Sequence, residues 1–329
     1  MANKKGKVLC VDDEPNILRS LQWLLQKEFE VLTASSGHDG LALVKQHSFD
    51  VVISDQRMPG MMGSEFLREV RILSPRSMRL LLTGYSDLPA ILRSVNEGEV
   101  FRFINKPWKI NELPKMVAEA ALIAQSQNPP ATDPAVAGAP IAEDDMDAIL
   151  VVDDDPLIVE RLLEGIGQRA RITHARNIAE AVAAFDTQDI GIILSDTRVG
   201  NVDTTRMLKV LKQEHPDIVT VVYTADSDAD DVITLINQGQ IFRFIPKPVK
   251  PITLMLAVSA AIVKRRQLKE NPDYTRRHVV ERVAQETRDS LEKDIEQVAK
   301  TSVPPSGVGG AGGFLSRVAG GFRRMFGGK

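Results

Sequence analysis

The chain has 329 residues, a hydrophobic content of 43% and a formal net charge of −3. This length predicts two domains rather than one, and the near-balanced charge lacks the overall basic character of a nucleic-acid-binding protein. The single cysteine, Cys10, lies in the apolar run 8–11, so we expect a reduced core residue, with neither disulfides nor a thiolate metal site. No apolar run approaches about 18 residues and no signal-type segment opens the chain, so we expect a protein that is neither secreted nor membrane-spanning.

The sequence contains an internal repeat of about a hundred residues. Three motifs recur: VLCVDDEP at 8–15 and ILVVDDDP at 149–156, SDQR at 54–57 and SDTR at 195–198, VFRFINKP at 100–107 and IFRFIPKP at 241–248. One shift of 141 residues aligns all three pairs without a gap. Because acidic, hydroxyl and lysine positions stay in step, the repeat indicates two copies of one domain.

Short apolar runs alternate with segments of helical period in the first copy. Strands are expected over 7–11, 30–34, 50–54, 78–83 and 100–104, and helices over 15–27, 37–46, 63–73, 88–97 and 110–124. Alternation of this kind implies right-handed crossovers, and continuous Val/Ile/Leu strands suit a sheet that is covered on both faces. Each copy is therefore predicted to be a doubly wound α/β domain with a five-stranded parallel, flavodoxin-like sheet.

Composition divides the chain into five segments. They are a first domain at 1–124, a flexible Pro/Ala-rich linker at 125–147, a second domain at 148–270, an amphipathic helix within 271–302, and a Gly-rich hinge with a basic tail at 303–329. The apolar face of the expected helix holds Val280, Ala284, Thr287, Leu291, Ile295 and Val298. This stripe is suited to docking on a partner or to self-association.

The tail FLSRVAGGFRRMFGGK has an amphipathic pattern. An arc of about 120° holds Phe314, Leu315, Val318, Phe322, Met325 and Phe326, and the opposite side holds Ser316, Arg317, Arg323 and Arg324. This pattern is typical of an interfacial membrane anchor, and FRRMFGGK resembles the C-terminal membrane-targeting helix of the septum-positioning ATPase family. A protein-binding peptide or a disordered end is an equal alternative, because Gly320 and Gly321 weaken the helix.

Polar residues recur at the ends of the predicted strands, where doubly wound folds bind their ligands. Asp12 and Asp13 close the first strand, Asp55 closes the third, Thr83 closes the fourth, and Lys106 follows the fifth. Three crowded carboxylates would repel one another unless a hard cation joined them, and oxygen ligands suit Mg²⁺. Such a site can accept a phosphoryl group on Asp55, with Lys106 and the metal neutralising its oxygens and Thr83 donating a hydrogen bond.

The motifs VDDEP, SDQRMPG, LLTG and FINKP resemble those of the receiver domain of two-component response regulators, over about 7–124 and 148–266. For the first copy the resemblance implies that Asp55 is phosphorylated. It also implies a Mg²⁺ ion held by Asp13, Asp55 and the carbonyl of Arg57, with Asp12 acting through water. Thr83 and Lys106 would contact the phosphoryl group and Phe103 would be the aromatic switch. A cis peptide bond is expected before Pro107.

The second copy matches these positions at Asp153, Asp154, Asp196, Arg198 (carbonyl), Thr224, Phe244, Lys247 and Pro248. It departs where VGN at 199–201 replaces MPG, and where Ala225 and Asp226 replace Gly84 and Tyr85. Because these flanking positions influence phosphoryl lifetime in the family, we predict that the two domains dephosphorylate at different rates. A degenerate second copy with a purely structural role is the alternative.

The function that the resemblance implies is that of a response regulator in a phosphorelay. A sensor histidine kinase would phosphorylate Asp55 and also Asp196, and the output would be contact with a downstream protein or a second copy of the chain, without a nucleic-acid-binding or separate catalytic domain. We expect a cytoplasmic protein whose tail makes peripheral contact with the inner face of the cytoplasmic membrane. The competing interpretation is a soluble adaptor or phosphate sink whose tail binds a protein.

Enzymatic readings fit the sequence less well. A haloacid-dehalogenase-type phosphotransferase also combines Asp, Thr, Lys and Mg²⁺, but its nucleophile ends the first strand in a DxD pattern, which VDDEP lacks. Residues 267–329 contain no acid/base or metal-ligand cluster, and the five histidines have no ligand spacing. We therefore expect no catalytic output beyond self-phosphorylation and dephosphorylation.

Overall fold

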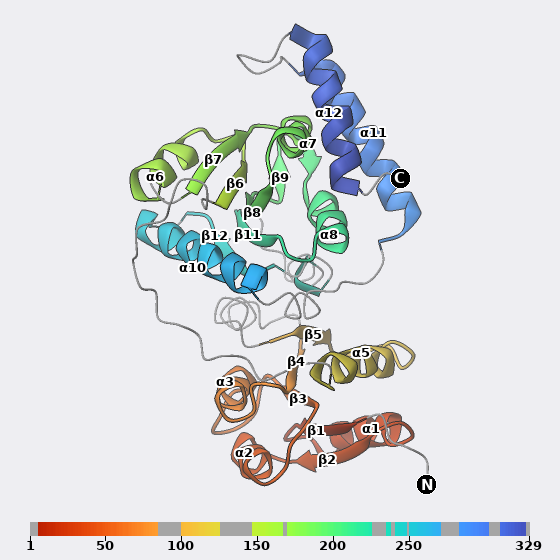
Figure 1. Cartoon of the computed structure of the whole chain (residues 1–329). Helices are drawn as coiled ribbons and strands as arrows, with labels where there is room; N and C mark the ends of the chain where they lie inside the picture. The colour runs from red at the N-terminus through yellow and green to blue at the C-terminus, as the bar shows by residue number, and fades with distance from the viewer. Residues whose placement is uncertain are drawn as a thin grey trace. The chain divides into compact units, whose positions relative to one another are not determined.

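The structure is a computed structural model that describes residues 6–84, 100–125, 147–166, 170–225, 235–237, 241–248, 250–270, 283–302 and 310–326. Two compact units are present, one built on the first sequence copy and one on the second copy together with the C-terminal helices (Figure 1). We call them the first and second domains. The expected helix at 88–97, Tyr85, Asp226 and almost all of the linker lie outside the described residues.

The first domain confirms the predicted doubly wound fold. Its strands are β1 (Lys7–Val11), β2 (Glu30–Ala34), β3 (Val51–Asp55), β4 (Met78–Thr83) and β5 (Arg102–Asn105), and its helices are α1 (Pro15–Leu25), α2 (Gly37–Gln46), α3 (Gly63–Leu73) and α5 (Leu113–Gln125). All strand pairs are parallel, in the order β2-β1-β3-β4-β5. Helices α1 and α5 cover one face of the sheet, and α2 and α3 cover the other (Figure 1).

Alternate residues of the central strand β1 enter different layers of the core. Val8 and Cys10 pack with Leu21 of α1 and Val117 of α5, and all four are fully buried. The opposite face of β1 meets α2, where a Cβ on Gly40 would lie 3.1 Å from the Val11 side chain. A strand between two helical layers needs apolar residues on both faces, which explains the continuous apolar run. Cys10 is a buried free thiol as expected, and burial raises its pKa to about 12.

The second domain repeats this topology in the order β7-β6-β8-β11-β12. Its strands are β6 (Asp147–Val152), β7 (Ala170–Ala175), β8 (Ile190–Ser195), β11 (Val219–Thr224) and β12 (Arg243–Pro246), and its helices are α6 (Leu157–Ile166), α7 (Ile178–Thr187), α8 (Thr205–Glu214) and α10 (Pro251–Glu270). An additional antiparallel hairpin, β9 (Arg198–Val199) with β10 (Val202–Asp203), fills the loop after β8. The VGN segment at 199–201, which replaces MPG of the first copy, lies in this hairpin.

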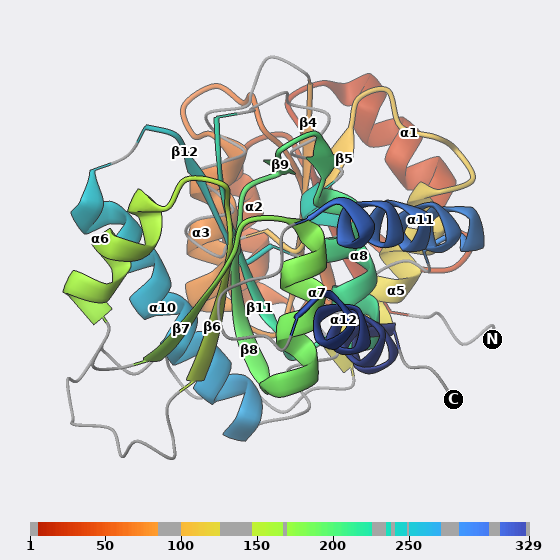
Figure 2. The same cartoon turned by 90° about the horizontal axis from the view of Figure 1, so that it is seen from above.

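Two C-terminal helices, α11 (Gln285–Thr301) and α12 (Gly310–Phe326), complete the second domain. They lie against α7 and α8, so that α7 is sandwiched between the sheet and α12 (Figure 2). Leu291, Ile295 and Ala299 are the buried residues of α11, in partial agreement with the predicted stripe. The helix of the tail begins at Gly310, inside the segment expected to be a hinge. Among the residues that the structure describes, no helix combines the length and apolar character needed to cross a membrane.

Candidate functional site

A lysine joins two carboxylates at the carboxyl ends of the first domain's central strands. Asp12 follows β1, Asp55 ends β3, and Lys106 follows β5. The Nζ atom of Lys106 lies 2.9 Å from Oδ2 of Asp12 and 2.6 Å from Oδ1 of Asp55. Asp12 is 0% and Asp55 6% exposed. The topology therefore brings together three of the residues that the sequence analysis singled out, from three different strand ends.

Backbone amides hold both carboxylates in place. The second oxygen of Asp12, Oδ1, accepts the amide of Glu14 at 2.8 Å, and Oδ2 of Asp55 accepts the amide of Arg57 at 2.6 Å. Thr83, at the end of β4, is 1% exposed and donates its hydroxyl to the carbonyl of Gly84 at 3.2 Å. Each side chain at this edge is therefore oriented by the strand end or loop that carries it.

Burial and ion pairing set the protonation of the site in opposite directions. Burial raises the pKa of Asp12, while the hydrogen bonds from Lys106 and from the Glu14 amide oppose the rise. Burial alone would lower the pKa of Lys106, but its hydrogen bonds to Asp55 and Asp12 outweigh burial and raise it. The lysine is therefore cationic at neutral pH and is available to neutralise a group that adds negative charge to Asp55.

The second domain contains the same arrangement. Nζ of Lys247 lies 2.7 Å from Oδ2 of Asp153 and 2.6 Å from Oδ2 of Asp196. The amide of Asp155 donates to Oδ1 of Asp153 at 2.9 Å, as the Glu14 amide does in the first domain. Burial alone would lower the pKa of Lys247, but its hydrogen bonds to Asp153 and Asp196 outweigh burial and raise it. A lysine that joins two carboxylates at the strand ends is thus present in both copies.

The loops beside the two acceptors differ. A Cβ on Gly63 would lie 2.8 Å from the carbonyl carbon of Asp55, so that only glycine fits where this loop closes on the strand. The second copy has Thr204 at the equivalent position, and its hydroxyl donates to the carbonyl of Asp196. The side-chain hydroxyl therefore holds the strand end that a tight backbone contact holds in the first domain.

Two further contacts are specific to the second copy. The hydroxyl oxygens of Thr197 and Thr224 lie 2.7 Å apart, whereas Gln56, at the position of Thr197, accepts the amide of Ser64 instead. The amide of Gly200 donates to Oδ2 of Asp154 at 3.2 Å, and Gly200 has a φ of +60°. The segment after β8 thus engages one expected phosphoryl-binding hydroxyl, through Thr197, and one expected metal ligand, through Gly200.

The expected aromatic switches are buried in both domains. Phe103 is 1% and Phe244 0% exposed. Phe101, directly before β5, is also buried, with the Arg102 guanidinium 5.2 Å from its ring centroid. The peptide bonds before Pro107 and Pro248 are cis, which confirms the expectation for Pro107.

The cation expected at these sites has a matching but incomplete donor set. In the described part of the chain no group of three His, Cys, Asp or Glu residues is gathered as a metal site. Asp13 is exposed, whereas Asp12 and Asp55 converge on a single lysine. Two carboxylates facing one ammonium leave excess negative charge, and all the available donors are oxygens. This chemistry fits a hard divalent cation.

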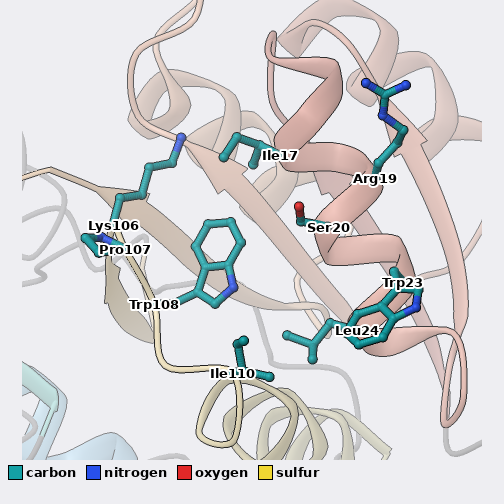
Figure 3. Close-up of a pocket in the computed structure, with 9 residues that line it drawn as sticks. All are labelled: Ile17, Arg19, Ser20, Trp23, Leu24, Lys106, Pro107, Trp108 and Ile110. Atoms are coloured by element: carbon teal, nitrogen blue, oxygen red, sulfur yellow. The ribbon is translucent and has the colours of Figure 1, made fainter.

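The structure also shows a groove beside Lys106 that was not predicted from the sequence. It has a volume of about 760 Å³ and runs between α1 and the segment after β5, lined by Ile17, Arg19, Ser20, Trp23, Leu24, Lys106, Pro107, Trp108 and Ile110 (Figure 3). Trp23 and Ile110 are each 62% exposed. An exposed tryptophan on a helix was the available sequence signal, because such side chains are enriched where proteins bind one another.

A family profile for the response regulator receiver domain matches residues 8–118 and 149–259. The chain belongs to the response regulator receiver family. It carries two receiver domains in tandem, and their five-stranded parallel sheets are those of the family fold. The recognition made from the four motifs is therefore confirmed for both copies.

Individual relatives match one receiver domain. Hydrogenase transcriptional regulatory protein HoxA of Cupriavidus necator is 41% identical over 120 residues, which are 36% of this chain and 25% of that protein. Transcriptional regulatory protein GlrR of Escherichia coli is 34% identical over 134 residues, 40% of this chain and 29% of that protein. The chain thus spans between 25% and 29% of the length of these two relatives.

Solved receiver structures give similar coverage. The signal receiver domain of an HD domain-containing protein from Pseudomonas fluorescens is 32% identical, with a TM-score of 0.36 over 38% of this chain and 93% of that one. A response regulator receiver domain protein from Clostridium thermocellum is 34% identical, with a TM-score of 0.34 over 36% of this chain and 96% of that one.

Proposed function

We propose that the protein is a response regulator of a two-component phosphorelay that accepts a phosphoryl group from a sensor histidine kinase on Asp55 and on Asp196. The observation that carries this proposal is the lysine bridge, Lys106 to Asp12 and Asp55, repeated by Lys247 in the second receiver domain. A carboxylate held beside a cationic lysine at a strand end can act as a nucleophile toward a phosphoryl group.

Each site residue has a separate role in the proposed phosphoryl transfer. A carboxylate oxygen of Asp55 forms the new O–P bond, the P–N bond of the donor phosphohistidine breaks, and the imidazole nitrogen keeps the electron pair. Lys106 moves from bridging Asp12 and Asp55 to facing the added oxygens. Thr83 turns its hydroxyl from Gly84 toward the same group. Asp12 stays behind as the carboxylate that holds Lys106.

The proposed cofactor is Mg²⁺. In the first domain Asp13, Asp55 and the carbonyl of Arg57 would hold it, with Asp12 acting through water; in the second domain the corresponding groups are Asp153, Asp154, Asp196 and the carbonyl of Arg198. When bound, the ion would neutralise negative charge on the transferring phosphoryl group. The Gly200 amide already engages Asp154, so we expect weaker metal binding in the second domain.

The groove beside Lys106 supports the first domain as the entry point for the phosphoryl group. A kinase helix that presents phosphohistidine to Asp55 must lie near Lys106, where exposed Trp23 and Ile110 offer apolar contact. The second copy has Glu164 at the position of Trp23 and Pro251 at that of Ile110. Only the first domain therefore presents a tryptophan to a docking helix at this position.

The proposed output is protein–protein contact in the cytoplasm. Phosphorylation adds up to about two negative charges to the acceptor, and the resulting rearrangement at Thr83 and Phe103, or at Thr224 and Phe244, would change the surface that binds a downstream protein or a second copy of the chain. The relatives HoxA and GlrR are named as transcriptional regulators. The receiver domains account for most of this chain, and we propose no nucleic-acid contact.

The amphipathic pattern of the tail supports peripheral membrane contact as a further part of the proposal. One such segment binds weakly, so two tails on a phosphorylation-induced dimer would gain from effective concentration. The competing proposal is a soluble adaptor or phosphate sink whose tail has no membrane role. Burial of the apolar side of α12 against α7 favours this second candidate.

The decisive experiment is phosphorylation with acetyl phosphate and Mg²⁺, followed by intact and peptide mass spectrometry. We expect one phosphoryl group on Asp55 and one on Asp196, each lost in the matching Asp→Asn variant. Lack of labelling in the unsubstituted protein would contradict the acceptor assignment. For the tail, co-sedimentation with vesicles is compared with and without a phosphoryl analogue; equal binding of both forms would exclude phosphorylation-driven recruitment.

A further inference from the structure

Helix α12 buries its apolar side in the second domain. Phe314 is 1%, Val318 7% and Met325 0% exposed, although these residues belong to the face expected to enter a membrane. Leu315, assigned to the same arc, is 44% exposed instead. Helix α12 packs mainly on α7, and both views show the two helices side by side (Figures 1 and 2). The apolar side of the tail therefore already has a partner within the chain.

The glycine pair of the tail sets how closely the two helices approach. A Cβ on Gly321 would lie 2.7 Å from the carbonyl carbon of Val182, and a Cβ on Gly320 would lie 2.6 Å from Cγ of Asp186. Both distances are too short for any side chain without movement of the backbone or neighbour. The glycines that weaken the isolated helix thus allow its close approach to α7: Gly321 lets the two backbones touch, and Gly320 leaves room for the Asp186 side chain.

Polar contacts fix the other end of the helix. His215, which follows α8, donates from Nε2 to the carbonyl of Arg324 at 3.0 Å. The guanidinium of Arg324 donates to the carbonyl of Phe185 at 3.5 Å and lies 4.0 Å from Oδ1 of Asp186. These contacts satisfy a carbonyl in the last turn of α12, which has no partner within its own helix.

Helix α11 strengthens the same attachment. Asp294 pairs with Arg206 of α8 at 3.1 Å, and Arg288 pairs with Glu214 at the end of α8. Leu291 and Ile295, each 1% exposed, supply the apolar contact. The α7–α8 face of the second domain is therefore covered by a pair of helices rather than by α12 alone.

The first domain provides an internal comparison. Its helix α2 aligns with α7 in the repeat, but His38, Ala42 and Lys45 on α2 are exposed. The equivalent residues of α7 are Ala179, Ala183 and Asp186, with Ala179 fully buried. On α7 a histidine would obstruct the close approach of α12, and a lysine would repel Arg324. Ala179 instead leaves room for α12, and Asp186 attracts Arg324. The docking surface is thus specific to the second domain.

We infer that α7 of the second domain is a built docking site for the chain's own tail helix, and that docking hides the apolar face that membrane binding needs. Phe314, Val318 and Met325 cannot contact acyl chains while they are buried in the second domain, so lipid binding and docking exclude each other. Docking of α12 on α7 follows from the contacts described here. The exclusion of lipid binding rests on the membrane role proposed above.

Docking is tested with two leucine variants of the full-length protein. Gly321→Leu places a side chain into the α7 backbone, whereas Ala319→Leu adds the same side chain at an exposed position of α12. The readout is tryptic cleavage after Arg317, followed by mass spectrometry. We expect cleavage to accelerate roughly tenfold or more in Gly321→Leu and to stay unchanged in Ala319→Leu. Equal cleavage of Gly321→Leu and the unsubstituted protein would overturn the docking site.

A second pair of variants tests specificity and tethers the tail. Ala179→His with Asp186→Lys gives α7 the residues of α2, and should also accelerate cleavage. Asp186→Cys with Gly320→Cys brings two Cβ atoms into disulfide range and, when oxidised, should slow cleavage below that of the reduced form. Unchanged cleavage in the α2-like variant would contradict the role assigned to the α7 side chains.

The same proteins are then mixed with vesicles containing anionic lipid. Stronger binding by Gly321→Leu than by Ala319→Leu, together with loss of binding in the oxidised disulfide variant, supports hiding of the apolar face. Equal binding by the oxidised variant and Gly321→Leu overturns it. Faster cleavage of Gly321→Leu without any vesicle binding retains the docking site and refutes the membrane role, so that the two ideas fail separately.

Discussion

In the second receiver domain, the hydroxyl oxygens of Thr197 and Thr224 lie 2.7 Å apart. Thr224 ends β11, at the position of Thr83 in the first domain, and Thr197 directly follows Asp196, the proposed acceptor. The hydroxyl that we expect to contact an added phosphoryl group is therefore already engaged by a neighbour. Gln56, which replaces Thr197 in the first domain, contacts Ser64 of α3 instead.

Removing the Thr197 hydroxyl should release Thr224. We expect Thr197→Val to accelerate phosphorylation of Asp196 by acetyl phosphate by about two- to tenfold, because one neutral hydrogen bond contributes about 1 kcal/mol. Thr197→Ser, which keeps the hydroxyl, is the matched control and should behave like the unsubstituted domain. The measurement is the rate of labelling in an Asp55→Ala background. A slower or unchanged rate in Thr197→Val would show that this contact does not compete with the phosphoryl group.

The two domains should also lose their phosphoryl groups at different rates. The hairpin β9–β10, the Gly200 amide on Asp154 and the Thr197 hydroxyl surround Asp196 but have no counterpart at Asp55. Lifetimes are measured after removal of donor in Asp196→Ala, which reports on Asp55, and in Asp55→Ala, which reports on Asp196. Identical lifetimes would mean that these loop differences have no kinetic effect.

Loss of the bridging lysine should destabilise the first domain. Lys106→Met leaves the buried carboxylates of Asp12 and Asp55 facing each other without a cation. Because the Lys106 side chain is 22% exposed and water can partly replace it, we expect the free energy of unfolding to fall by about 1–3 kcal/mol in urea titrations without Mg²⁺. Asp12→Asn added to Lys106→Met should recover part of the loss. A further drop in the double variant would argue against carboxylate repulsion as the cause.

Stability of the second domain should depend on pH through Lys212. Its Nζ donates to the carbonyls of Pro216 at 2.8 Å and Ile218 at 2.6 Å, and burial lowers its pKa from 10.5 to about 7. Between about pH 7 and pH 10 the unfolded chain binds a proton that the folded domain does not bind. The free energy of unfolding should therefore rise with pH across this window, by up to about 1.4 kcal/mol per pH unit, and this gain should be lost as pH falls toward 7.

The measurement for Lys212 is a series of urea titrations at several pH values. Lys212→Met provides the comparison, because it removes the titrating group and keeps the length of the side chain. The difference in unfolding free energy between the two proteins should change with pH in the stated direction. A constant difference would show that Lys212 stays charged in the folded state.

The groove beside Lys106 should matter for transfer from a protein donor and not from a small one. Trp23→Glu introduces the residue type found at the equivalent position of the second domain, Glu164. We expect phosphorylation of Asp55 in cells to fall severalfold, because an exposed aromatic contact is lost, while labelling by acetyl phosphate stays unchanged. Arg19→Ala, at the polar side of the same groove, serves as a milder comparison. Equal losses with both donors would indicate damage to the acceptor site itself.

Most of the fold and the placement of both proposed acceptor sites were predictable from local pattern. The alternation of Val/Ile/Leu strands with amphipathic helices determines a doubly wound sheet. This topology places Asp12, Asp55 and Lys106 at the same edge of the sheet, whatever the details of helix packing. The gapless repeat then extends the assignment to Asp153, Asp196 and Lys247. The placement of these residues at the sheet edge depends on the order of strands and helices, which the sequence pattern predicts.

Contacts between distant segments were not predictable in the same way. The amphipathic pattern of the tail fits a membrane and a protein partner equally well, because one apolar face does not specify what covers it. The closeness of Gly321 to Val182 and the link from Thr197 to Thr224 depend on backbone positions separated by many residues. The sequence by itself therefore determined the tandem receiver folds and brought Asp12, Asp55 and Lys106, with their counterparts Asp153, Asp196 and Lys247, to the strand ends. Only the tertiary structure decided which face the tail occupies, since helix docking depends on shape complementarity between two surfaces rather than on the period of either one.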